Sequence, residues 1–184
     1  MRKLTMPELN RLTVEEFKAA EKIPIIIVLD NIRSQNNIGS VFRTADAFLL
    51  QRIYLCGITA TPPHREIHKT ALGATESIDW RYFEHTCDAL SALHAEGYAI
   101  IAVEQTDNSI PLDKYSPPPG KKLAFLFGNE VNGIEDRLLK FVDSCIEIPQ
   151  FGTKHSLNIS VAAGIVLWDV LTKQKIIINK CNPL

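Results

Sequence analysis

The sequence has few cysteines, and this scarcity excludes two classes of protein. Cys56, Cys87, Cys145 and Cys181 are widely spaced and form no CxxC pair. A small disulfide-stabilised scaffold and a cysteine zinc site are therefore not predicted. The five histidines do not cluster at metal-ligand spacing either. We expect free thiols and no bound metal.

Long apolar runs are also missing. The longest one near the start, residues 23–29, is far shorter than the roughly 20 residues that span a bilayer, and it contains a proline. Polar and acidic residues follow Met1-Arg2-Lys3, where a secretory signal would have an apolar block. These absences predict a cytoplasmic protein with no membrane segment.

The chain carries no large excess of one charge. Its formal net charge is −1 and its isoelectric point is about 6.5, so it lacks the basic character of a protein that coats nucleic acid. Any contact with RNA must then be local. The local candidates are Arg33 with Arg43, the run at residues 64–69, Lys121-Lys122 and Lys154-His155, although each alone is better explained as a solvated surface.

With 184 residues, of which 46% are hydrophobic, the chain is long enough for one domain with a substantial core. Residues 1–22 are predicted to form an amphipathic helical leader, with Thr13 and Glu16 at the spacing of a capping box. Residues 23–175 form the main domain. Residues 176–184 are a C-terminal tail with no clear pattern.

Strand-like apolar runs alternate with helical patterns along the main domain. The runs lie at residues 25–29, 52–56, 79–83, 98–103, 123–127 and 144–148, and the helical patterns at 37–50, 86–95, 134–141 and 156–175, with a mixed segment at 67–74. This alternation predicts an α/β fold with a mostly parallel sheet flanked by helices. Ligands bind such sheets at the carboxyl ends of the strands, which directs attention to the loops after Leu29, Val103, Phe127 and Ile148.

The first polar segment at such a strand end is NIRSQNNIGSVFRTADA, residues 31–47. Its apolar residues recur at helical spacing, and Arg43 lies off that apolar stripe. An arginine in the first turns of a helix beside a strand-end loop can bind a phosphate. On spacing alone Asn37 is better explained as a helix N-cap, whereas Arg43 could equally be a surface charge.

The second segment is LAFLFGNEVNGI, residues 123–134, in which an apolar strand leads directly into Gly128, Asn129 and Glu130. A glycine at a strand end lets a ligand approach the backbone closely, and Glu130 places a carboxylate in the same crevice. A tight turn, with Glu130 stabilising the start of the next helix, remains an alternative.

The third segment is IPQFGTKHSLNISVAAG, residues 148–164. The helix that it opens is apolar on nearly every face, so it must be buried or shared with a partner chain. Ser156 and Asn158 lie at its start, where Ser156 would suit an N-cap. The chain contains no GxSxG, P-loop or HExxH motif, which removes the commonest other chemistries of an α/β chain this size.

The ordered set NIGSVFRTA, LFGNEVNGI and IPQFGTKHSLNISVAAGI resembles the three signature motifs of the SpoU (TrmH-like) RNA 2′-O-ribose methyltransferases of the SPOUT superfamily. The resemblance covers residues 25–171. It implies a domain whose C-terminal part forms a deep trefoil knot around an S-adenosyl-L-methionine pocket, a homodimer, and tRNA or rRNA as the substrate that is methylated on a ribose 2′-OH. Periodicity alone does not show these properties.

The resemblance also assigns roles to individual residues. Arg43 would grip the phosphate beside the target ribose and help to activate the 2′-OH. Asn37, Ser156 and Asn158 would orient Arg43 and the sugar, and Glu130 would hold the polar network of the site. The implied catalytic residues are Arg43, Asn37, Glu130, Ser156 and Asn158. The implied cofactor-binding residues are Val103, Gly128, Asn129, Ile148, Pro149 and Leu157.

Three other functions fit parts of the pattern. A catalytically silent RNA-binding member of the same fold would bind RNA without turnover, although all five polar residues are present. An unrelated α/β nucleotide- or flavin-binding protein would use Gly128 and Gly133 around a phosphate, but the expected glycine fingerprint is missing. A family member that methylates a base nitrogen would differ only in its acceptor.

Overall fold

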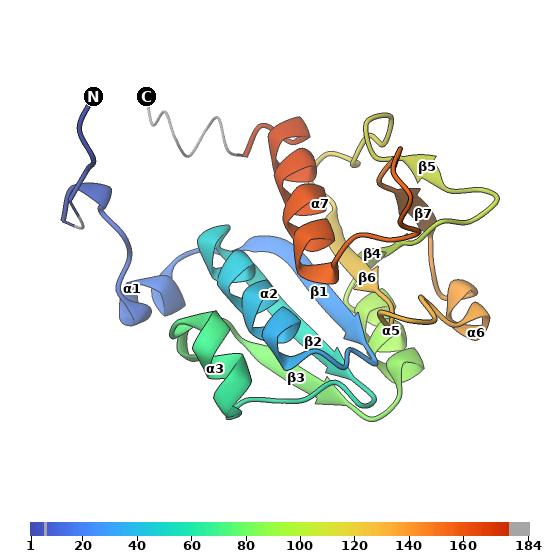
Figure 1. The fold of residues 1–184 in the computed structure, drawn as a ribbon, viewed down its shortest axis with the longest axis horizontal. Coiled ribbons are helices and arrows are strands. Elements are labelled where there is room, and N and C mark those ends of the chain that lie inside the picture. The colour runs from blue at the N-terminus through green and yellow to red at the C-terminus, as the bar shows by residue number, and fades with distance from the viewer. Residues whose placement is uncertain (6, 177–184) are drawn as a thin grey trace.

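The structure, a computed structural model, describes residues 1–5 and 7–176 and contains a seven-stranded parallel sheet (Figure 1). The strands are β1 (Ile23–Asp30), β2 (Leu50–Cys56), β3 (Trp80–Phe83), β4 (Tyr98–Val103), β5 (Ile110–Pro111), β6 (Lys122–Phe127) and β7 (Ser144–Glu147). The helices are α1 (Val14–Ala19), α2 (Gln35–Ala47), α3 (Arg65–Ala71), α4 (Ala74–Ser77), α5 (Thr86–Ala95), α6 (Asp136–Leu139) and α7 (Ile159–Lys173).

The strand order determines where loops meet. It runs β3-β2-β1-β6-β4-β7-β5, and each pair of neighbours is parallel. The chain builds outward from β1 to β3 and then crosses to the other side, so β1 and β6 adjoin at a switch point. The loops that leave β1, β6, β4 and β7 therefore emerge side by side at one edge. The predicted α/β fold with a mostly parallel sheet is confirmed.

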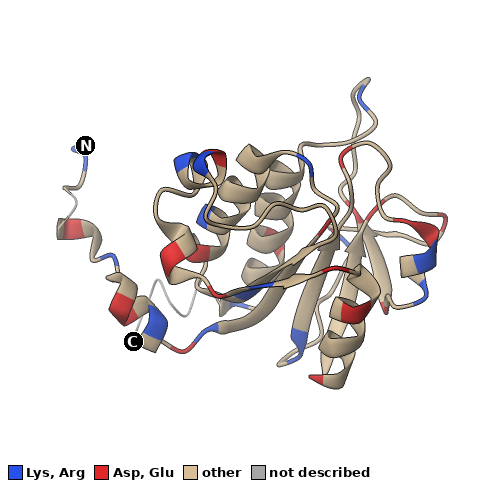
Figure 2. Cartoon of the chain, turned by 90° about the horizontal axis from the view of Figure 1, so that it is seen from below, with Lys and Arg blue, Asp and Glu red and all other residues tan. Residues whose placement is uncertain are grey.

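The core has two layers because alternate side chains of β1 point to opposite faces of the sheet. Ile25, Ile27 and Leu29 pack in the layer that contains α2 and α7, whereas Ile26 and Val28 pack in the layer that contains α5. Seven of the eight β1 residues are buried, as expected for a central parallel strand. Charged residues lie mainly at the ends and outer faces of elements, and both signs are interspersed (Figure 2).

Two helix starts differ from the sequence prediction. The helix α2 begins at Gln35 because the Ser34 hydroxyl accepts the Asn37 N–H at 3.3 Å. Asn37 is therefore inside the helix, and its predicted alternative role as N-cap is wrong. The helix α7 begins at Ile159, capped by Asn158, whose side chain accepts the Ser160 N–H at 2.9 Å. Ser156 is thus not an N-cap.

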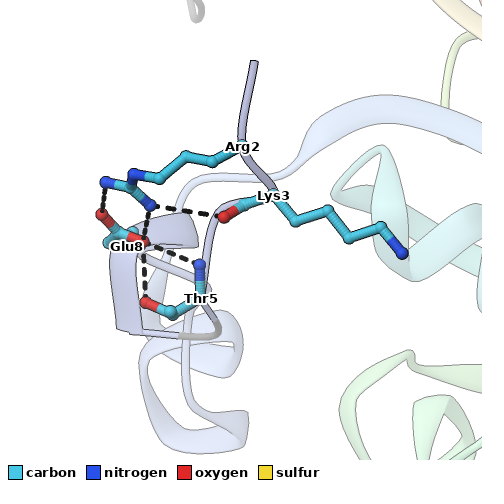
Figure 3. Close-up of polar contacts among 4 residues, drawn as sticks. All are labelled: Arg2, Lys3, Thr5 and Glu8. Carbon is cyan, nitrogen blue, oxygen red and sulfur yellow. Dashed lines mark hydrogen bonds and ion pairs between the residues drawn. The ribbon is translucent and has the colours of Figure 1, made fainter.

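The N-terminal segment contains a short 3-10 helix, Pro7–Leu9, followed by α1. The predicted capping box is present, because Thr13 and Glu16 each accept the other's backbone N–H. Near the N-terminus the Glu8 carboxylate accepts hydrogen bonds from two Arg2 guanidinium nitrogens, at 2.6 and 2.9 Å (Figure 3). This pairing, with hydrogen bonds from Thr5, lowers the pKa of Glu8 to about 2.

Membrane helices, metal-ligand clusters and free cysteines can be described only for residues 1–5 and 7–176. No helix within residues 1–5 and 7–176 is long and apolar enough to cross a membrane. In the same part of the chain no three histidine, cysteine or acidic side chains gather as metal ligands would. Cys56, Cys87 and Cys145 are free thiols. Cys181 and the predicted tail beyond Ile176 lie outside the described residues.

Candidate functional site

A cavity of about 640 Å³ opens at the carboxyl edge of the sheet. This volume lies in the range that holds small molecules and cofactors in proteins. Its walls come from the ends of β4, β6 and β7, from the loop before α7 and from Asn37 of α2. The residues used below are Asn37, Val103, Glu104, Gly128, Asn129, Glu130, Asp136, Glu147, Ile148, Ser156, Leu157 and Asn158.

Glu130 fastens the loop after β1 to the loop after β6. One carboxylate oxygen accepts the Arg33 N–H at 3.0 Å, and the other accepts the Ser34 N–H, also at 3.0 Å. The Asn37 side-chain amide donates to the same carboxylate at 3.4 Å. The N-terminal end of α2 is favourable for an anion because its first N–H groups have no partner within the helix. The carboxylate therefore fixes the start of α2 relative to the cavity.

The side-chain amide of Asn37 also connects α2 to the start of α7. The Asn158 side-chain nitrogen donates to the Asn37 oxygen at 3.0 Å, and the Asn158 oxygen accepts from the Ser160 backbone and hydroxyl at 2.9 and 2.7 Å. Glu130, Asn37 and Asn158 thus form a continuous hydrogen-bonded chain, here called the polar bracket. It connects three segments that are far apart in sequence at the rim of one cavity.

The electrostatics of Glu130 follow from these contacts. Partial burial acts to raise the pKa of its carboxyl group, but the hydrogen bonds from Arg33, Ser34 and Asn37 outweigh it, so the net pKa is lowered. Donors that point at a carboxylate stabilise its charged form. Glu130 is therefore an anion at neutral pH and serves as an acceptor.

The turn after β6 is tightly built. The Asn129 side chain donates to the Asn31 carbonyl at 2.7 Å and accepts the N–H groups of Val131 and Asn132 at 2.9 and 3.2 Å. A Cβ added to Gly128 would lie 2.3–2.5 Å from the backbone of Gly133 and Ile134. Gly128 is thus required by the turn itself, in addition to any ligand.

Glu104 lines the cavity but was not singled out from the sequence. It follows Val103 at the end of β4, and its carboxylate accepts the Ile134 N–H at 3.0 Å and the Gln105 N–H at 2.9 Å. A Cβ on Gly133 would approach the same carboxylate to 2.3 Å. The available signal was a carboxylate directly after a buried strand, at an edge already identified as the ligand side.

The charged side chains of the cavity wall are mainly acidic. Four carboxylates line the cavity, from Glu104, Glu130, Asp136 and Glu147, and none of its described lining residues is lysine or arginine. Charges of one sign in a cleft concentrate ions of the opposite sign. The cavity therefore favours a ligand with positive charge.

Two of the residues that the sequence singled out lie outside this cavity. Arg43 is exposed on α2 and does not line it. Pro149 lines a separate groove beside α7, together with Trp168 and Ile165. Ser156 and Leu157 do line the cavity, as do Val103, Gly128, Asn129 and Ile148. The structure therefore gathers nine of the eleven implied residues around one cavity.

The chain matches the model of the SpoU rRNA Methylase family over residues 24–168. It is 29% identical over 157 residues to the 23S rRNA (guanosine-2′-O-)-methyltransferase of Neisseria meningitidis serogroup B, with 85% of this chain and 61% of that protein covered. It is 28% identical over 149 residues to the tRNA (guanosine(18)-2′-O)-methyltransferase of Borreliella burgdorferi, with 81% of this chain and 66% of that protein covered.

Among solved structures, the AdoMet-bound rRNA methyltransferase from Sinorhizobium meliloti is similar, with a TM-score of 0.76 and 26% identity over 85% of this chain and 59% of that one. The chain spans about two thirds of the length of the curated relatives described above. The similarity therefore concerns only part of each of these proteins.

Proposed function

The chain belongs to the SpoU rRNA Methylase family, and from this premise we propose that it is an S-adenosyl-L-methionine-dependent RNA methyltransferase that modifies a ribose 2′-OH of tRNA or rRNA. The observation that carries the proposal is the polar bracket of Glu130, Asn37 and Asn158 at the rim of the cavity. The printed names of relatives that act on a guanosine 2′-O position support the ribose as acceptor.

The cavity fits the proposed cofactor in size and charge. S-adenosyl-L-methionine supplies a methyl group on a positively charged sulfonium, and the four carboxylates of the wall favour a cation. Val103, Ile148 and Leu157 offer apolar walls, while Gly128 and Asn129 place backbone at the edge. Pro149 lies in a different groove, and we assign it no contact with the cofactor.

The residues of the chain contribute mainly by holding the acceptor in place. Methyl transfer requires the ribose oxygen to be in line with the methyl group and partly deprotonated, and positioning alone lowers the barrier substantially. We assign the phosphate beside the ribose to Arg43, and the orientation of the sugar to Asn37, Ser156 and Asn158. Arginine stays protonated, so Arg43 acts by binding and electrostatics, not as a free base.

Titration with S-adenosyl-L-methionine tests the cofactor site. We expect binding to the wild-type chain. Leu157→Lys removes an apolar contact and adds a charge of the same sign as the ligand, so it should raise the dissociation constant about tenfold or more, which corresponds to about 1.4 kcal/mol. Leu157 is 38% exposed on a loop, so the substitution should leave the fold intact while it disrupts the apolar wall. Isothermal calorimetry measures both constants.

A substitution at Gly128 is a poor probe of the cofactor, because any side chain there collides with the turn backbone. The matched control is Leu12→Lys, which alters an exposed leucine outside the cavity and should leave binding unchanged. Incubation of the wild type with labelled cofactor and total tRNA or rRNA then tests the reaction. Absence of both cofactor binding and a new 2′-O-methyl group would overturn the proposed function.

We further propose that the protein works as a homodimer through the outer face of α7. Three large apolar side chains on this helix are exposed: Trp168 at 56%, Val161 at 51% and Ile165 at 38%. They border an apolar groove that also includes Leu112 and Pro149. An exposed apolar patch of this kind marks an interaction surface, and the same face repeated on a second copy would make a two-fold interface.

Trp168→Asp is expected to convert the dimer to a monomer of 20.6 kDa, because a carboxylate would be buried without a partner at the interface. Sedimentation equilibrium measures the mass, and circular dichroism checks that the monomer is folded. The control is Leu12→Asp, at an exposed leucine outside this face, and it should remain dimeric. A wild-type chain that sediments as a monomer at micromolar concentration would contradict this arrangement.

We also propose how the chain is divided into a domain and two terminal segments. We assign residues 23–175 to the methyltransferase domain with a C-terminal trefoil knot, residues 1–22 to a helical leader and residues 176–184 to a tail. Phe17 is buried against the main core, which supports a leader that packs on the domain.

A further inference from the structure

We propose that α3 and the cleft beside it form a second RNA-contact site, which takes one unpaired nucleotide of the RNA outside the methyl-transfer cavity. This proposal rests on the proposed function for the identity of the ligand. It concerns a different surface, here called the α3 cleft, which lies between the β2–α3 loop, α3, α4 and the start of β3.

The shape and lining of the α3 cleft suit a nucleobase. Its volume is about 540 Å³, and its lining includes the rings of Pro62, Pro63, His64, His68 and Trp80. Trp80 is partly buried against the core, so its ring is held in place while part of it remains accessible. Single-stranded RNA is recognised by bases that stack on aromatic and imidazole rings.

Two cations of α3 could contact the phosphate of such a nucleotide, because Arg65 lines the cleft and Lys69 lies about one turn further along the same helix. The side chains of Arg65 and Lys69, on α3, are 94% and 72% exposed. Each approaches the Glu66 carboxylate only to 3.9–4.0 Å, and exposed pairs of this kind contribute little. Both cations are therefore available to a phosphate, for which arginine has matching bidentate geometry.

The carboxylates near the cleft set the direction of the nucleotide. Glu76 lines the wall formed by α4, where it would repel a phosphate and accept a hydrogen bond from an amino group of a base. Glu66 lies between Arg65 and Lys69 and reduces the local positive charge. The arrangement favours the base between Trp80 and the prolines, with its phosphate at the α3 side.

The α3 cleft is connected to the polar bracket through the packing of α3 on α2. The helix α3 packs directly on Gly39 of α2, where an added Cβ would meet Thr70 and Ile67 at 2.1 and 2.3 Å. The Thr70 hydroxyl donates to the Asn36 carbonyl at 3.0 Å, one residue before Asn37. An RNA bound in the α3 cleft would therefore be held at a fixed position relative to Arg43 and the polar bracket.

Neutralising the two cations tests the phosphate contact. Arg65→Gln with Lys69→Gln is expected to weaken binding of a fluorescein-labelled, mixed-sequence single-stranded oligoribonucleotide about tenfold at 0.15 M salt. The slope of log affinity against log salt should fall by about one for each lost phosphate contact. With tRNA or rRNA as substrate, KM should rise by a similar factor while kcat stays within about twofold.

The matched control is Lys114→Gln with Lys140→Gln, which removes the same charge from two exposed side chains that follow β5 and α6. The α3 cleft lies beside β3, at the opposite edge of the sheet from β5. The control should change neither affinity nor salt slope. If both double variants behave alike, the effect is one of net charge and the proposed contact is wrong. If the wild type binds the oligoribonucleotide but does not methylate tRNA or rRNA, the result would instead count against the proposed function, since binding is measured independently of turnover.

Tryptophan fluorescence tests the base contact. The chain has two tryptophans, so Trp168→Phe leaves Trp80 as the only emitter. RNA is expected to quench this emission because a base stacks on the ring, and the quenching should follow the binding curve. In Trp80→Phe, the emission of Trp168 should be unaffected by RNA. Unquenched Trp80 at saturating RNA would overturn the proposal.

Discussion

Replacing Arg43 with alanine is expected to lower the rate of methyl transfer at least about a thousandfold, equivalent to roughly 4 kcal/mol of transition-state stabilisation, while cofactor binding stays nearly unchanged. The reason lies in its position: Arg43 projects from α2 into solvent and does not line the cavity. Its loss therefore removes a group that would bind RNA without altering the cofactor wall.

The effect on stability should be small. Within the described part of the chain Arg43 forms no ion pair, and alanine is a strong helix former in the middle of α2. Single-turnover rates at saturating cofactor and RNA, with calorimetry of S-adenosyl-L-methionine, separate turnover from binding. Arg43→Lys should recover part of the rate, because it keeps the charge but loses the bidentate geometry.

Near-wild-type methylation by Arg43→Ala would show that Arg43 does not act on the reacting nucleotide. Membership of the family would be unaffected, since it rests on the match over residues 24–168. The search for the activating group would then return to the residues that do line the cavity, of which Ser156 has a hydroxyl nearest in sequence to Asn158.

The central strands could be predicted from sequence because they are buried on both faces. The predicted strand at residues 98–103 and the predicted helix at residues 86–95 have the same bounds as β4 and α5. The apolar run of the strand and the glycine at position 97, between the two elements, define these bounds. The strand β5 was missed, since two residues carry no period. It exists because Ile110 and Pro111 pair with β7.

Helix starts were less predictable, because several residues in a row had side chains that can cap. The caps are Ser34 and Asn158 instead of Asn37 and Ser156. Both cap residues also contact other segments, Ser34 through Glu130 and Asn158 through Asn37. Asn37 is held by Glu130 and Asn158, which lie 93 and 121 residues away in sequence. Only the fold brings these groups together, so local propensity could not reveal that the residue is part of a bracket.

Many of the residues that line the cavity could be predicted from sequence, but their geometry could not. Strand ends and motif resemblance directed attention to the loops after β1, β6 and β7, and these loops do meet. Glu104 was overlooked because no motif marked it, although it lies on an edge that the parallel sheet makes a ligand side. Arg43 was predicted together with the cavity residues, yet it lies about 1.7 helical turns beyond Asn37 on α2 and does not line the cavity.

Replacing Glu130 with glutamine is expected to lower kcat/KM about ten- to a hundredfold, equivalent to roughly 1.4–2.7 kcal/mol. The carboxylate accepts the N–H groups of Arg33 and Ser34 and the amide of Asn37. Glutamine has one oxygen, and its NH₂ group would face a donor. The start of α2 would then shift relative to Asn158, which weakens the alignment of the acceptor.

The pH dependence distinguishes this role from a general loss of structure. Folding lowers the pKa of Glu130, so its stabilising contribution is complete above the unfolded value of about 4.3 and is lost as the pH falls through the lower folded value. Chemical unfolding of the wild type and Glu130→Gln at pH 7 and in the acid range should therefore show a difference that shrinks on acidification. A difference that is independent of pH, or an unchanged kcat/KM, would mean that the bracket does not depend on this charge.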